Sequence, residues 1–176
     1  MKYRSLALAL GLTSIAAPAH AIFHLWEVTE VFSNADGTVQ FVEFYSEDSG
    51  QEFLTGQVLE TVQQNVVRSQ FTFPTSIPVP QGESTADRHF LVATPAFLAV
   101  AGIAPDFEIP VGFLEPGIID EVALVGADAM DFAAGALPTD GLNSLNDPGG
   151  GEPVFAAAAT PTNFAGQIGT IVPEPD

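Results

Sequence analysis

The chain has 176 residues, with 22 acidic side chains against four lysines and arginines, and contains no cysteine. The strong negative charge excludes binding to nucleic acid or to an anionic membrane surface through charge. Without disulfide bonds, the fold must be held by core packing or by bound metal. Fourteen phenylalanines and 47% apolar residues make packing sufficient and argue against disorder.

Residues 1–21 have the pattern of a secretory signal peptide. Lys2 and Arg4 precede a short apolar run, and Ala19-His20-Ala21 is an A-x-A cleavage pattern. The run is too short for a membrane span. We therefore expect cleavage before Ile22 and a secreted or periplasmic mature chain, without a membrane span, in which two arginines remain against 22 acidic residues.

Alternating apolar residues predict a β-hairpin at the start of the mature chain. The two arms of residues 24–45 flank Asp36-Gly37, a strong hairpin signal. With an even loop, Phe32 lies opposite Phe41, Val28 opposite Tyr45, and the side chains of Trp26, Val28, Glu30 and Phe32 share one face. Further strands are expected at residues 58–62, 66–73 and 89–94.

The second half mixes one helix with strands and loops. A short helix is predicted over residues 95–104, because Thr94 suits the N-cap and Pro95 the first helical position. Residues 118–125 read as a strand, and residues 128–134 fit either helix or strand. From Leu137 the composition predicts long C-terminal loops, mobile over 143–163, with a final edge strand at 168–172.

Several separated stretches together resemble a known family. These stretches are HLWEVTEVFSNADGTVQFVEFY, FTFPTSIP, DRHFLVATPAF, APDFEIP, LPTDGLNSL and TPTNFAGQIG. In them the sequence resembles a group of secreted bacterial proteins related to the lamin-tail domain. The resemblance implies an all-β fold, an immunoglobulin-like β-sandwich, over residues 22–172, followed by a tail at 173–176. It implies no catalytic residues. The Val172-Pro173-Glu174-Pro175 end is similar to part of a bacterial sorting signal, from which we infer no anchoring.

The predicted register places Glu30 opposite Glu43 on a largely apolar face. Two facing carboxylates cost stability unless something satisfies them. Backbone N–H groups of a neighbouring loop would do so, as would an arginine lying across the pair. We expect Arg68 or Arg88, and Arg88 first because it directly precedes an apolar strand. A catalytic carboxylate pair in an aromatic cleft is the alternative.

Other reactive groups are sparse. Of the three histidines, His24 and His89 remain after cleavage, and each is expected to have a structural role. We predict no catalytic, cofactor-binding or metal site. Calcium is the one metal that the oxygen-rich residues would suit, and its weak candidate ligands are Glu30, Glu43, Asp140 and Asp147. The loop pattern of a calcium site is absent, and Asp and Asn in such segments are usually turn formers.

The sequence therefore favours a non-enzymatic module for extracellular binding or structural interaction, with a protein or glycan partner. It names neither the ligand nor the oligomeric state. The alternative is a small extracellular hydrolase that uses the Glu30 and Glu43 pair, which would require both carboxylates in a groove open to solvent.

The cleavage site gives the first testable prediction. Mass spectrometry of the exported protein should show Ile22 as its first residue, because signal peptidase cuts after the A-x-A pattern. A mature protein that still begins at Met1 would contradict it.

Overall fold

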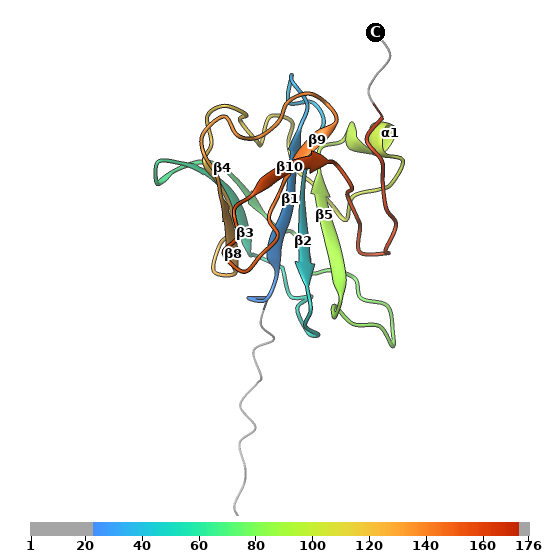
Figure 1. Ribbon diagram of the computed structural model, residues 1–176. Coiled ribbons are helices and arrows are strands. Elements are labelled where there is room, and N and C mark those ends of the chain that lie inside the picture. The colour runs from blue at the N-terminus through green and yellow to red at the C-terminus, as the bar shows by residue number, and fades with distance from the viewer. Residues whose placement is uncertain (1–22, 173–176) are drawn as a thin grey trace, which may run out of the picture.

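Two β-sheets packed face to face make up the described part of the computed structural model, residues 23–172 (Figure 1). The first sheet has the order β10-β9-β1-β2-β5-β6 and the second the order β4-β3-β7-β8. The first contains β1 (Glu27–Ser33), β2 (Gln40–Ser46), β5 (Arg88–Ala93), β6 (Phe107–Glu108), β9 (Asn143–Asn146) and β10 (Phe155–Ala158). The second contains β3 (Val58–Gln63), β4 (Val66–Thr72), β7 (Glu121–Leu124) and β8 (Asp128–Asp131). The predicted all-β sandwich with one short helix is confirmed, whereas the predicted signal peptide and tail lie outside the described residues.

The β1–β2 hairpin forms as predicted around its turn. Phe32 pairs with Phe41 and Glu30 with Glu43. The Asn34 N–H donates to the Val39 carbonyl (3.0 Å), so four residues close the loop. Gly37 has a φ of 72°, a left-handed conformation that glycine adopts without strain.

A β-bulge in β1 changes the predicted faces of the sheet. The register shifts between Val28 and Glu30, so that Val28 pairs with Phe44 rather than with the predicted Tyr45. Thr29 is the extra residue of the bulge. Trp26 and Val28 consequently belong to the core between the sheets, while Glu30 and Phe32 point to the opposite side of β1. The prediction that these four side chains share one face is therefore wrong.

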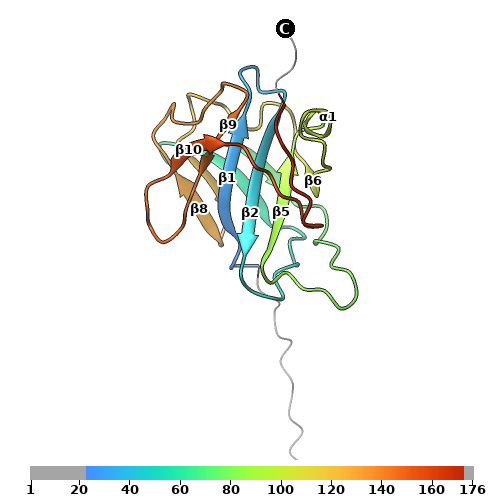
Figure 2. The ribbon, with the colours of Figure 1, turned by 45° about the vertical axis from the view of Figure 1, so that its right-hand side comes forward.

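The first sheet buries both of its faces. Its inner face packs on the second sheet through a core that includes Trp26, Phe44 and Phe90. Its outer face carries Phe32 and Phe41 and a second apolar cluster. Helix α1 (Phe97–Ala101) and the chain after β10 cover this outer face, and Figure 2 shows that chain running across β1, β2 and β5. We call residues 159–172 the C-terminal strap.

The helix is shorter than predicted, and its N-terminus differs. Its N-cap is Ala96, which makes no side-chain capping bond. Thr94 instead donates its hydroxyl to the Thr38 carbonyl (2.7 Å) and accepts from the Gln40 N–H (3.0 Å). Phe97 and Ala101 lie one turn apart and are buried, and Gly102 ends the helix with a φ of 73°.

The region predicted as mobile loops contains ordered strands. β9 and β10 pair with each other, and β9 pairs with β1, so residues 143–146 and 155–158 extend the first sheet. Residues 128–131 form a strand, β8, which decides the ambiguity there. No strand forms at residues 168–172, where the predicted edge strand is replaced by the strap.

Gln40 in β2 gives the second testable prediction. Its buried side chain accepts from the Leu114 N–H (3.1 Å) and donates to the Leu114 carbonyl (2.6 Å). The side-chain amide thus pairs with both main-chain groups of Leu114, as a residue of a neighbouring strand would. An unpaired buried polar group costs about 1–3 kcal/mol. Gln40→Leu should lower the free energy of unfolding by at least about 2 kcal/mol in urea denaturation.

The matched control is Gln70→Leu, because Gln70 donates only to Glu60 at the surface of β4. A change there should stay within about 0.5 kcal/mol. Equal stability of the two variants would contradict the role assigned to Gln40.

Candidate functional site

The carboxylates of Glu30 and Glu43 are buried beneath the C-terminal strap. Their residues are 3% and 4% exposed, and they stand on neighbouring strands at paired positions. The bulge at Thr29 directs Glu30 to this outer face, where Phe32 and Phe41 flank the pair along the strands. Such burial is unfavourable for ionised carboxylates unless each finds several donors.

Glu30 receives two hydrogen bonds from different elements. The Ser144 hydroxyl on β9 donates to its Oε1 at 2.5 Å, and the Thr160 N–H of the strap donates to the same oxygen at 2.9 Å. Burial raises the pKa of Glu30 to about 7, the two bonds oppose that rise, and the nearby charge of Glu43 adds to it. Glu30 thus holds its proton more readily than an ordinary glutamate does.

Glu43 is satisfied from three sides. Its Oε1 accepts from the Thr29 hydroxyl (3.1 Å) and lies 2.9 Å from His89 Nδ1. Its Oε2 accepts from the Thr162 N–H of the strap. His89, on β5, is the only titratable group among the donors, and its side chain is one-third exposed.

A third carboxylate, which is half-buried, extends this arrangement toward α1 and β6. Asp106 Oδ2 accepts from the Leu91 N–H (2.8 Å) and from the Phe164 N–H of the strap (2.9 Å). Burial raises the pKa of Asp106, and these two bonds oppose the rise. Glu30, Glu43 and Asp106 therefore receive the N–H groups of residues 160, 162 and 164, and we call these three side chains the carboxylate ladder.

The predicted arginine partners lie elsewhere, so that prediction is wrong. Arg68 pairs with Glu115 (2.8 Å) at the surface. Arg88 pairs with Glu83 (2.9 Å), and its guanidinium lies over the ring of Phe164, 5.8 Å from the centroid. The alternative donors, backbone N–H groups of a neighbouring segment, are observed, and side chains of β1, β5 and β9 complete the set. A backbone donor replaces an arginine because the strap can lie directly over the sheet.

The calcium candidates are not brought together. Glu30 and Glu43 hold the strap, whereas Asp140 accepts from the N–H groups of Leu142 (2.9 Å) and Asn143 (2.8 Å) within its own turn. Asp147 accepts from the Gly149 N–H (2.8 Å) in another turn. Across residues 23–172, no three His, Asp or Glu side chains are grouped so as to hold a metal ion.

The two histidines have different roles. His89 contacts Glu43, as described, and packs against the ring of Tyr45 with 4.9 Å between centroids. The exposed His24 lies 2.7 Å from the Gly126 carbonyl through its Nδ1. Both contacts suit side chains that hold neighbouring segments in place.

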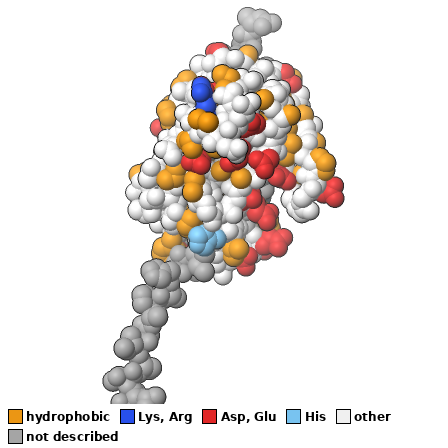
Figure 3. Space-filling view, turned by 90° about the vertical axis from the view of Figure 1, so that its left-hand side faces the viewer, with side chains coloured by type: hydrophobic (Ala, Val, Ile, Leu, Met, Phe, Trp, Pro, Cys, Tyr) orange, Lys and Arg blue, Asp and Glu red, His pale blue; other side chains and the backbone are white. Residues whose placement is uncertain are grey.

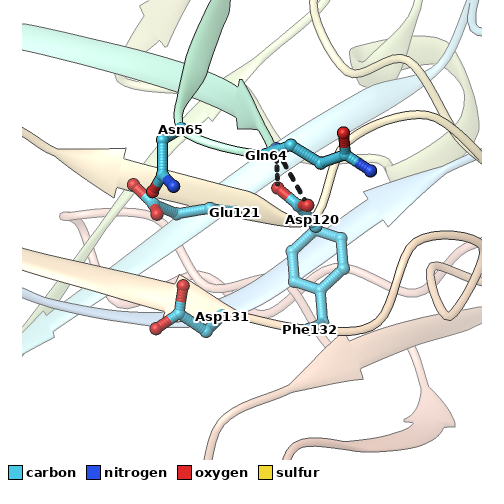
Figure 4. Close-up of a pocket in the computed structure, with 6 residues that line it drawn as sticks. All are labelled: Gln64, Asn65, Asp120, Glu121, Asp131 and Phe132. Atoms are coloured by element: carbon cyan, nitrogen blue, oxygen red, sulfur yellow. Dashed lines mark hydrogen bonds between the residues drawn. The ribbon is translucent and has the colours of Figure 1, made fainter.

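Acidic side chains gather in a band on the side of the molecule where β3, β4 and β8 lie (Figure 3). At one end it contains a shallow depression lined by Gln64, Asn65, Asp120, Glu121, Asp131 and Phe132 (Figure 4). Glu121 pairs across β7 and β8 with Asp131. Partial burial raises the pKa of Glu121, and the charges of Asp131, Glu60 and Asp120 add to the rise. We call these four residues, Glu60, Asp120, Glu121 and Asp131, the acidic face.

Comparison with known proteins identifies no relative. No protein-family model matches the chain, and searches of curated proteins and of solved structures likewise find no match. The resemblance to the lamin-tail domain therefore stays a prediction. Separately, no helix within residues 23–172 is both long enough and apolar enough to cross a membrane.

Sequence reasoning found the glutamate pair but missed most of what surrounds it. Asp106 and Ser144 gave no signal, because each lies far along the chain from the residues that it contacts. The alternation of Thr160, Thr162 and Phe164 precedes Gly166 in a segment that reads as a loop. Only the path of the strap shows that its N–H groups face carboxylates.

The hydroxyl of Ser144 gives the third testable prediction. Ser144→Ala removes a fully buried donor from Glu30. A hydrogen bond to a charged group contributes about 1.5–3 kcal/mol, so we expect thermal or urea unfolding to show a loss of that order. Ser76→Ala is the control, because that hydroxyl shares an exposed hydrogen bond with Thr55. A Ser144→Ala variant as stable as the control would show that Glu30 does not depend on this donor.

Proposed function

We propose that the protein is a secreted, non-enzymatic β-sandwich module of the lamin-tail type that binds an extracellular protein or glycan. One observation carries the proposal. The carboxylate pair that the sequence offers as catalytic machinery, Glu30 and Glu43, is buried and hydrogen-bonded to the strap. Side chains that are occupied in this way do not meet a substrate.

The hydrolase alternative requires a different environment for the same two residues. A pair of glycosidase carboxylates flanks the scissile bond in a cleft that admits substrate and water. Here the strap crosses the pair, and the residues are 3% and 4% exposed. The geometry thus favours a structural role for the pair over a catalytic one.

The acidic face is the surface best suited to a partner. Both arginines of the described chain are engaged in ion pairs, with Glu115 and Glu83. The unpaired excess charge is therefore negative, and a partner with basic groups would be attracted by it. Among the two partner classes, this chemistry favours a basic protein surface over a neutral glycan.

The lamin-tail assignment is part of the proposal. It is supported by the sequence stretches that resemble that domain and by the two-sheet sandwich in which they lie. The first hairpin, which lies within one of these stretches, carries Glu30 and Glu43 at paired positions in its two strands.

The fourth testable prediction concerns this acidic face. The protein is screened against extracellular proteins and glycans, and the affinity for a captured partner is measured at low and high salt. Binding should weaken with salt, since exposed charges are screened. Glu121→Gln should lower the affinity by up to about fivefold, because an exposed charge pair contributes about 0.2–1 kcal/mol.

Glu108→Gln is the control, since Glu108 is exposed on β6 in the other sheet. Equal effects of the two substitutions would place binding elsewhere on the molecule. Hydrolysis of a polysaccharide that is lost in Glu43→Gln would support the hydrolase instead.

A further inference from the structure

The C-terminal strap is attached to the sheet without joining it. Within residues 159–172, the one bridge of the β type links Thr162 to Ile168 of the strap itself. Its contacts with the carboxylate ladder are main-chain N–H groups, and residues 165–168 are exposed. Ala159 and Ile171 anchor the strap in the outer apolar cluster. Outside the ladder, the Asn163 side chain donates to the Ala104 carbonyl (3.0 Å), and main-chain N–H groups near the two ends of the strap donate to the carbonyls of Leu142 and Ala101. Between these ends, the ladder supplies the acceptors that hold the strap over β1, β2 and β5.

The charge balance under the strap depends on protons. The titratable groups that face Glu30 are Glu43 on β2 and His89 on β5. The groups that β9 and the strap contribute there are neutral: the Ser144 hydroxyl and the N–H groups of Thr160 and Thr162. Neither arginine of the described chain contacts the pair. When both glutamates are ionised, the buried layer carries excess negative charge unless His89 is protonated.

We propose that the strap is a pH-sensitive cover: a proton held by Glu30 beneath the strap keeps it docked, and loss of that proton at mildly alkaline pH loosens it. Loosening uncovers the outer face of the first sheet, including Phe32 and Phe41. This inference does not rest on the proposed function, because it concerns only the contacts between the strap and the sheet.

The direction of the effect follows from linkage. The pKa of Glu30 is raised from 4.5 to about 7 in the docked state. Between these values the docked state binds more protons than the open state, so docking weakens as pH rises. Asp106, whose pKa burial also raises, acts in the same direction.

Hydrogen exchange of the full chain tests the proposal. Protection of the Thr160, Thr162 and Phe164 amides is measured near pH 6 and near pH 8.5 and corrected for intrinsic exchange. If opening restores the ordinary pKa of Glu30, protection should fall about tenfold between the two conditions. The Val42 and Leu59 amides, in the two sheets, should change much less. Constant protection of the strap, or an equal loss at Val42 and Leu59, would overturn the proposal.

Two further measurements separate charge from structure. Glu30→Gln keeps the acceptor for Ser144 and Thr160 but carries no charge, so strap protection should lose the tenfold change, and only the smaller contribution of Asp106 should remain. The control is Glu60→Gln in the other sheet, which should keep the tenfold change. A tenfold change that persists in Glu30→Gln would refute the mechanism. Should that variant not fold, the carboxyl carbon shift of Glu30 in the parent should titrate near pH 7, and a midpoint near the ordinary 4.5 would overturn the proposal.

Discussion

Hydrogen bonds from the main chain of the C-terminal strap to buried carboxylates complete this fold. The outer face of the first sheet carries large apolar side chains, among them Phe32 and Phe41, that would otherwise meet water. Helix α1 covers only part of that face because it has five residues. The strap covers more, and its N–H groups would be unsatisfied there without acceptors. Glu30, Glu43 and Asp106 supply those acceptors. The strap therefore covers the apolar side chains of the sheet while its own N–H groups remain hydrogen-bonded.

One inserted residue, Thr29, determines that Glu30 faces the strap rather than the core between the sheets. Without the bulge at Thr29, the side chains of β1 would alternate evenly, and Glu30 would share a face with Val28. With the bulge, Val28 enters the core between the sheets and Glu30 turns to the outer face. A carboxylate pair between two apolar sheets would have no segment to supply donors. The bulge therefore separates the apolar core from the polar contacts that fasten the strap.

The same arrangement bears on function. The carboxyl groups of Glu30 and Glu43 are engaged in holding the strap, which is why we propose that the function lies in the surface of the molecule. That surface is acidic on the second sheet, and the arginines are already paired. A rigid sandwich with a charged face suits recognition rather than chemistry. The strap adds a segment whose attachment depends on protonation, since its acceptors are titratable and its donors are not.

The sequence by itself determined the class of the fold, because its signals are local: alternation predicts strands, and Asp36-Gly37 fixes a hairpin whose pairing of Phe32 with Phe41 is observed. It also determined that Glu30 and Glu43 face each other. It did not reveal what satisfies them, and it suggested Arg88 from chain position alone. Tertiary structure decided that question, since Ser144, Thr160 and Thr162 lie more than 100 residues from the glutamates that they contact. Contacts between such distant segments depend on the path of the whole chain. Thr160 and Thr162 donate through main-chain N–H groups, which nearly every residue type has, so the sequence does not identify them as donors.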